Sequence, residues 1–289
     1  MTNHGFGRIL LATDGSEQAN AAVGITASFA RASSASVLVV HVWNLEVHHR
    51  HGVWDIEMRT EADALLTTTV GRLRDSGVTV DGIITHADHN HVAAAIAEAA
   101  RTFQADLVVA GSRGLSDWAS IVEHSTTHQL LSCIDCPLLI VRSTSGAEPH
   151  IAQRVLLAVA GGDDLLPAVR AAAAAAVGPG SEVMVVHVAQ CIVGVQGFAY
   201  VEPKEEIQET IDHANALLED AGIATSSVVP DAGPVAQIIA GTAADWGADV
   251  IVIGSSRMGD VGSLLLGSVT HDLLRATDRP VLVAERIGA

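Results

Sequence analysis

The segment Arg8-Ile-Leu-Leu-Ala-Thr-Asp-Gly15 returns 146 residues later as Arg154-Val-Leu-Leu-Ala-Val-Ala-Gly161. Three more pairs follow in the same order: Val37–Val42 with Val183–Val188, Ala105–Ser112 with Ala248–Ser255, and Ser125–Leu131 with Ser268–Leu274. The offset between the copies changes only from 146 residues (Arg8 to Arg154) to 143 (Ser125 to Ser268). Such self-similarity is the signature of a duplicated structural unit. We therefore predict two domains, at residues 1–146 and 147–289.

Each copy alternates short apolar runs with longer segments of helix-forming composition, for example 19–31, 93–103 and 168–177. The apolar runs lack polar alternation, as expected when helices cover both faces of a parallel sheet. The sequence thus predicts an α/β protein of two tandem Rossmann-like domains, each a parallel sheet flanked by helices. A small, polar segment at 143–153, which contains Pro149, is the predicted linker. Ligands of such sheets lie beyond the carboxyl ends of the strands, where the strand order reverses.

Composition restricts the classes of partner. The chain has 289 residues, 49% of them hydrophobic and 17% charged, which is typical of a globular protein. A formal net charge of −17 argues against a broad face for nucleic acid or anionic membrane. No apolar run is long enough for a membrane span, no signal-peptide pattern opens the chain, and three cysteines cannot form a disulfide framework. We expect a cytoplasmic protein.

A glycine-containing loop follows the fourth predicted strand of each copy. The first reads Gly111-Ser-Arg-Gly114, then a ten-residue loop, then Ser125-Thr126 at a helix start; the second reads Gly254-Ser-Ser-Arg257, then a loop and Gly267-Ser268-Val269. Glycines allow close approach of the backbone to a ligand, and the free N–H groups of a helix N-terminus bind anions. Because Lys204 is the only lysine, a phosphate site must rely on such N–H groups. In the first copy, Asp14 ends the first strand and could accept hydrogen bonds from ribose hydroxyls.

Taken together, these residues resemble the universal stress protein family in its tandem-domain form, over nearly the whole chain. The resemblance implies a five-stranded parallel sheet in the order 3-2-1-4-5 in each domain. In the ATP-binding subset of this family, the motif is Gly, two residues, Gly, nine residues, then Gly-Ser or Gly-Thr, with an Asp after the first strand. The resemblance also implies ligand contacts from the backbone of the Val that follows the His of the second strand.

Neither copy contains the complete nucleotide-binding motif of the family. The first copy has the residues expected at a nucleotide site, except that His124 stands where the family has its third glycine; the candidates are Thr13, Asp14, Val42, Gly111, Gly114, His124, Ser125 and Thr126. The second copy retains Val188, Gly254, Gly267, Ser268 and Val269. It has Ala160 in place of the Asp and Arg257 in place of the second glycine. We predict that ATP or a related adenine nucleotide binds chiefly in the first copy, and that the second site is degenerate.

Histidines offer an alternative site. Ten of the 14 lie in the first copy, and three groups follow its predicted strands: His48, His49 and His51; His86, His89 and His91; His124 and His128. Imidazoles are common Zn²⁺ ligands, but the spacing matches no metal template, and solvated loops explain these residues equally simply. His41 and His187 lie inside apolar strands and are interpreted as hydrogen-bonded core residues. Cys133-Ile-Asp-Cys136 has redox-motif spacing, yet it falls between a helix end and a strand, which favours idle thiols.

Three functions are compatible with the sequence. The first is a stress-response regulatory protein whose nucleotide shifts a conformational equilibrium. The second is an interaction scaffold that has lost its nucleotide and binds a protein partner; in the family, domains pair through their last strands, so a tandem chain could form an internal pseudo-dimer, or a homodimer of chains. The third is slow ATP hydrolysis or metal-assisted hydrolysis at the histidine-rich edge, for which no general base or catalytic lysine is visible.

Overall fold

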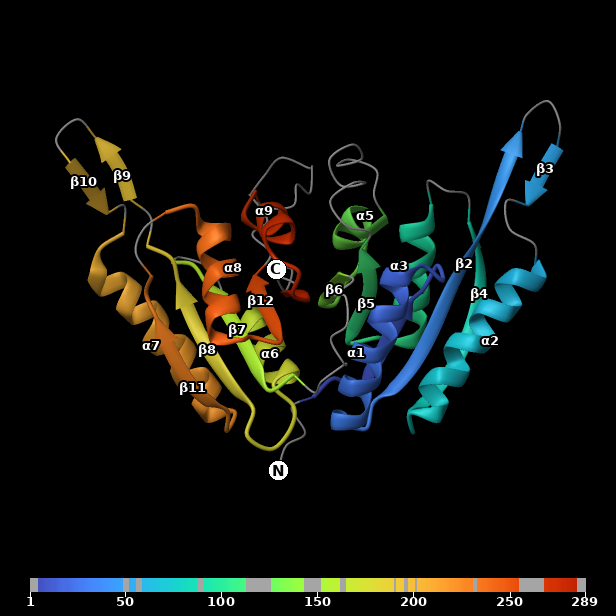
Figure 1. Ribbon diagram of the computed structural model, residues 1–289, viewed down its shortest axis with the longest axis horizontal. Coiled ribbons are helices and arrows are strands. Elements are labelled where there is room, and N and C mark those ends of the chain that lie inside the picture. Colours follow the sequence, from blue (N-terminus) through green and yellow to red (C-terminus); the bar gives the residue numbers. More distant parts are fainter. Residues whose placement is uncertain are drawn as a thin grey trace. The chain divides into compact units, whose positions relative to one another are not determined.

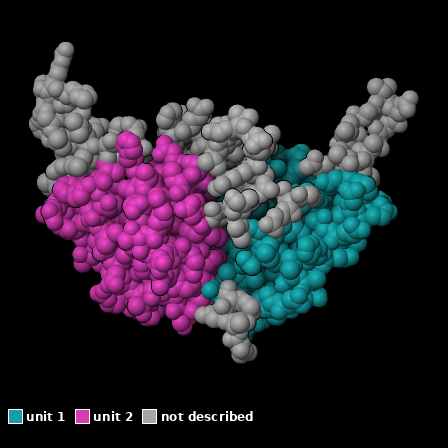
Figure 2. All heavy atoms as spheres, turned by 180° about the vertical axis from the view of Figure 1, so that it is seen from behind, with its two compact units in different colours: residues 1–5, 151–289 teal, residues 6–150 magenta. Residues whose placement is uncertain are grey.

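The chain folds into two compact units, 6–150 and 151–289, the second grouped with residues 1–5 (Figure 2). We call them the N-terminal and C-terminal domains. The computed structural model describes residues 5–48, 52–55, 59–87, 91–112, 126–142, 152–161, 165–189, 191–194, 197–200, 202–230, 233–254 and 268–284.

The described part of the N-terminal domain is a parallel sheet with the strand order β4-β2-β1-β5-β6 (Figure 1). A short strand, β3, pairs antiparallel with the far end of β2, which the sequence did not predict. Helices α1 and α2 pack together, as do α3 and α5, and each pair packs against the strands. The elements are β1 (Arg8–Ala12), α1 (Glu17–Ser33), β2 (Ser36–His48), β3 (Gly52–Asp55), α2 (Arg59–Asp75), β4 (Thr79–Ala87), α3 (Val92–Phe103), β5 (Leu107–Ser112), α5 (Thr126–Cys133) and β6 (Leu138–Arg142).

The described part of the C-terminal domain repeats this plan, with the strand order β11-β8-β7-β12-β13. Helices α6 and α7 pack together, as do α8 and α9. A separate antiparallel hairpin, β9–β10, comes between β8 and α7 in the chain order (Figure 1). The elements are β7 (Arg154–Val159), α6 (Leu166–Ala175), β8 (Glu182–His187), β9 (Cys191–Gly194), β10 (Gly197–Tyr200), α7 (Lys204–Asp220), β11 (Ala224–Val228), α8 (Val235–Trp246), β12 (Val250–Gly254), α9 (Ser268–Ala276) and β13 (Val281–Ala284). Both domains confirm the predicted order 3-2-1-4-5.

Burial of the central strands explains why their sequences lack polar alternation. In β1, Leu10 and Leu11 have no exposed surface, although their side chains point to opposite faces of the sheet. The equivalent residues of β7, Leu156 and Leu157, are buried to the same degree. Helices therefore cover both faces of each sheet, as predicted. The first helix of the chain begins at a defined cap, since the Ser16 hydroxyl accepts a hydrogen bond from Ala19 N at 3.2 Å.

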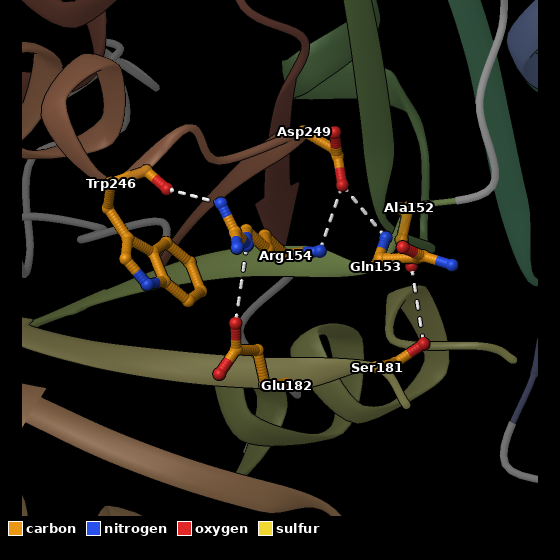
Figure 3. A network of polar contacts seen from close by, with 7 residues as sticks. All are labelled: Ala152, Gln153, Arg154, Ser181, Glu182, Trp246 and Asp249. Atoms are coloured by element: carbon orange, nitrogen blue, oxygen red, sulfur yellow. Dashed lines mark hydrogen bonds and ion pairs between the residues drawn. The ribbon is translucent and has the colours of Figure 1, made fainter. Parts of the chain in front are cut away.

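An aspartate anchors the start of the central strand in each domain. In the C-terminal domain, Asp249 Oδ2 accepts hydrogen bonds from Gln153 N (2.8 Å) and Arg154 N (2.9 Å), and Arg154 Nη1 donates to Trp246 O at 3.1 Å (Figure 3). The guanidinium of Arg154 also lies 3.3 Å from the Glu182 carboxylate on the neighbouring strand. These contacts join the first, second and fourth strands of the sheet at their amino ends.

The N-terminal domain contains the same anchor. Asp106 accepts hydrogen bonds from Gly7 N at 2.7 Å and from Arg8 N at 2.9 Å, and Arg8 Nη1 donates to Phe103 O at 3.2 Å. Asp106 and Asp249 belong to the repeated Ala-Asp segment of the sequence. This pair of aspartates is therefore explained by strand alignment and not by ligand binding.

We expect Asp249→Ala to lower the free energy of unfolding by about 1–2 kcal/mol. Two backbone N–H groups lose a charged acceptor, but water partly replaces it because the site is half-exposed. Urea denaturation of the whole chain measures the change, with Asp245→Ala, an exposed aspartate of α8, as the matched control. Equal losses in both variants would show that the anchor contributes nothing specific.

Candidate functional site

Three predicted site residues of the N-terminal domain lie at one edge of the sheet. Ala12, the last residue of β1, pairs with Val40 of β2 on one side and with Ala110 of β5 on the other. Asp14 follows β1 by two residues, Val42 lies two residues beyond Val40, and Gly111 comes directly after Ala110. The register thus brings these three residues to the carboxyl end of the central strand, where the strand order reverses.

A tight turn presents Asp14 to solvent at this edge. Thr13, which is buried, donates its N–H to Val40 O at 3.0 Å, and its carbonyl oxygen lies 2.9 Å from His41 Nδ1. Ser16 N donates to Asp14 Oδ1 at 3.0 Å. The exposed carboxylate of Asp14 is held by this turn, so it can accept further hydrogen bonds from a ligand without first becoming ordered.

The next position of the turn favours glycine. Gly15 has a φ of +77°, and a Cβ built there would overlap with Leu65 Cδ1 of α2. Any larger residue would be strained in the backbone and would displace Leu65. The Asp-Gly dipeptide of the sequence is the local signal of this geometry, and the turn sets the direction of the Asp14 side chain.

The structure describes only some of the residues that are predicted to bind the phosphates. Thr126 begins α5 and is half-buried. Gly114, His124 and Ser125 lie outside the described residues, as do most residues of the loop that contains them. The structure therefore brings together the candidates on β1, β2 and β5, and leaves the arrangement around the start of α5 as a prediction.

The C-terminal domain brings the equivalent positions together. Val159 of β7 pairs with His187 of β8, and Ala158 pairs with Ile253 of β12. Ala160, Val188 and Gly254 therefore lie at the carboxyl edge, as predicted. Ser268 begins α9, and Val269 is 37% exposed; Arg257 and Gly267 fall outside the part of the chain that is described.

A carboxylate that sequence reasoning missed lies beside this second edge. Glu202, from the segment before α7, has its Oε2 2.7 Å from His187 Nε2. Its Oε1 lies 3.2 Å from the position of a Cβ built on Gly161, directly after Ala160. The side chain of His187 is 2% exposed and that of Glu202 is 25% exposed. Glu202 therefore brings a negative charge to a domain that has lost the strand-end aspartate.

A cavity of about 510 Å³ opens next to Glu202. It is bounded by β7, β8 and α7, and the residues that line it are Ala160, Gly161, Leu165, His187, Glu202, Glu206, Ile207, Glu209, Thr210 and His213. Among these described lining residues there are three glutamates and two histidines, and neither lysine nor arginine. The cavity is therefore acidic, which is unfavourable for a phosphate group.

The histidines occupy different environments. The prediction for His41 is confirmed, because it is 4% exposed and its Nδ1 contacts Thr13 O. For His187 the prediction is confirmed only at Nε2, since its buried Nδ1 has no hydrogen-bond partner among the described residues. His48 lies within β2, not after it, and the ring of His86 in β4 packs on Trp43 with centroids 4.9 Å apart.

The described residues contain no group of three or more His, Cys, Asp or Glu side chains arranged to hold a metal ion. His49, His51, His89 and His124 lie outside the described ranges, so the histidine-rich edge as a whole stays a hypothesis. Cys133 ends α5 and is exposed, Cys136 precedes β6 and is half-buried, and neither forms a disulfide bond. No helix among the described residues is long and apolar enough to cross a membrane.

Comparison with known proteins identifies the family. The model of the universal stress protein family matches residues 5–142 and again residues 152–285. The chain belongs to this family. Both copies match, so the resemblance inferred from the sequence is confirmed for each domain.

Individual relatives agree with this assignment. A universal stress protein from Thermus aquaticus is 32% identical over 148 residues, which cover 47% of this chain and 99% of that protein. One from Methanocaldococcus jannaschii is 32% identical over 82 residues, 28% of this chain and half of that relative's length. The crystal structure of a universal stress protein from Archaeoglobus fulgidus superposes with a TM-score of 0.73 at 20% identity, covering 96% of both chains, and so shares the fold.

Proposed function

We propose that this universal stress protein is a stress-response regulatory protein that binds ATP or a related adenine nucleotide, chiefly in its N-terminal domain. The observation that carries the proposal is the exposed, turn-held carboxylate of Asp14 at the point where the strand order reverses. Val42 and Gly111 lie at the same edge, on the strands to either side. An exposed, ordered acceptor at this edge is suited to a ribose.

Each part of the proposed site has a distinct chemical role. Asp14 accepts hydrogen bonds from the ribose hydroxyls, and the backbone at Val42 borders the base. Gly111 lets the chain approach the ligand closely at the end of β5. The N–H groups at the start of α5, near Ser125 and Thr126, hold the phosphates, where the helix dipole favours negative charge.

The contrast between the two domains supports placing the nucleotide in the first. In the C-terminal domain Ala160 offers no acceptor for a ribose, and the Glu202 carboxylate lies against Gly161. A nucleotide there would lose the charge-assisted hydrogen bonds that a strand-end aspartate makes. Binding in the N-terminal domain would regulate the protein only if the ligand prefers one conformation over another, for example one arrangement of the Gly111–Ser125 loop.

Isothermal titration calorimetry of the whole chain with ATP and AMP tests the proposal. We expect one nucleotide per chain for the wild type. His124→Gly, which restores the third glycine of the family motif, is expected to bind more tightly because the phosphates gain room at the start of α5. Binding by His124→Gly alone would show that His124 has closed the site and that the wild type does not use a nucleotide. Absence of binding in both proteins would overturn the proposed function.

A further inference from the structure

We propose that the acidic cavity of the C-terminal domain binds a small organic di- or polyamine. The cavity of about 510 Å³ has a volume within the usual range of small-molecule sites, roughly 300–1,000 Å³. This proposal concerns the second domain and does not depend on nucleotide binding by the first.

The charges of the cavity come from one face of α7 and from the segment before it. Glu206, Glu209 and His213 are spaced three and four residues apart, so they lie on the same side of the helix. Glu202, from the segment before the helix, lies next to Gly161 and lines the same cavity. Two glutamates three residues apart repel each other, and a cation placed between them and Glu202 relieves that repulsion.

His187 gives the cavity a fixed, buried polar wall. Its side chain is 2% exposed, it lines the cavity, and its Nδ1 has no partner among the described residues. A carboxylate only accepts hydrogen bonds, so His187 Nε2 donates to Glu202 Oε2 across 2.7 Å. This bond fixes the Glu202 side chain and leaves Oε1 available to accept from an ammonium group. Part of the site is thus ordered before the ligand arrives.

The geometry favours an extended organic cation over a metal ion or an anion. A metal ion needs several ligands at one point, and the described residues provide no such group. An anion would face three carboxylates. A flexible amine with charges several bonds apart can pair with Glu202 at one end and with Glu206 or Glu209 at the other, while its methylenes contact Leu165 and Ile207.

Calorimetric titration of the nucleotide-free whole chain with spermidine and with 1,4-diaminobutane tests this inference. We expect saturable binding of one spermidine per chain, with 1,4-butanediol, the uncharged counterpart of the diamine, showing no binding. Glu206→Gln/Glu209→Gln is expected to weaken binding about tenfold, because one end of the amine loses both carboxylates with which it can pair. The matched control is Glu205→Gln/Glu219→Gln, which removes the same charge from exposed positions of the same helix outside the cavity.

The outcomes distinguish a specific amine site from nonspecific attraction of cations to an acidic protein. Loss of affinity in the cavity variant and retention in the control supports the proposal. Equal weakening in both variants, or no saturable binding by the wild type, overturns it. ATP titrations of the same proteins report separately on the N-terminal domain, so failure of one proposal is distinguishable from failure of the other.

Discussion

Replacing Asp14 with alanine is expected to weaken ATP binding by roughly ten- to hundredfold, with a change in unfolding free energy below about 1 kcal/mol. The carboxylate is exposed, and its hydrogen bond from Ser16 N, at 3.0 Å, lies in a surface turn that water can satisfy. Its hydrogen bonds to ribose hydroxyls would be charge-assisted, each worth about 1.5–3 kcal/mol. A loss of about 1.4 kcal/mol is a tenfold change in affinity. Calorimetry with ATP measures the first effect and urea denaturation the second.

Two further variants test whether the change in ATP affinity depends on the carboxylate of Asp14. Asp14→Asn keeps an acceptor oxygen but removes the charge, so it should bind with intermediate affinity. Asp81→Ala removes an exposed carboxylate from β4 near the amino end of that strand, away from the site, and should bind as the wild type does. Wild-type affinity in Asp14→Ala, with wild-type stability, would contradict the role assigned to Asp14 even if the protein binds ATP elsewhere.

The sequence was sufficient to predict the fold because the pattern that determines it was present twice. Fully buried strands such as β1 and β7 appear as uninterrupted apolar runs, and the helices between them have a distinct composition. The two antiparallel strand pairs, β2–β3 and β9–β10, were not predicted from the local sequence. The far end of β2, Asn44–His48, contains polar and histidine residues that indicated a loop, yet Leu45, Val47 and His48 pair with β3. Pairing with β3 decided the conformation of that segment.

Sequence motifs were sufficient to predict which residues of the N-terminal domain meet at the edge of the sheet. Asp14 comes two residues after β1 and Gly111 lies near the end of β5, and parallel pairing places them at one edge. Glu202 could not be found in this way, because its partner His187 is 15 residues away and no spacing rule links a residue before a helix to the end of a strand. The loss of the aspartate at Ala160 was visible in the sequence, but the carboxylate that lies beside it required the folded chain.

Removing the Glu202 side chain is expected to lower the free energy of unfolding by about 2 kcal/mol. In Glu202→Ala, His187 stays buried and loses the 2.7 Å hydrogen bond at Nε2, while its Nδ1 already lacks a partner among the described residues. A buried polar group without a partner costs about 1–3 kcal/mol. Urea denaturation measures the change, and Glu205→Ala, an exposed residue in the first turn of α7, is the control that should change stability by less than about 1 kcal/mol.

A double-mutant cycle with His187→Leu separates the hydrogen bond from the packing of either side chain. Once the imidazole is gone, Glu202 loses its partner but remains 25% exposed and can be hydrated, so removing Glu202 as well should cost little. We therefore expect the double variant to be more stable than the sum of the single changes predicts, with a coupling energy of about 1–2 kcal/mol. Strict additivity would mean that the contact between Glu202 and His187 contributes no net stability. In that case the position of Glu202 beside the end of β7 would be set by the chain around it and not by its hydrogen bond to His187.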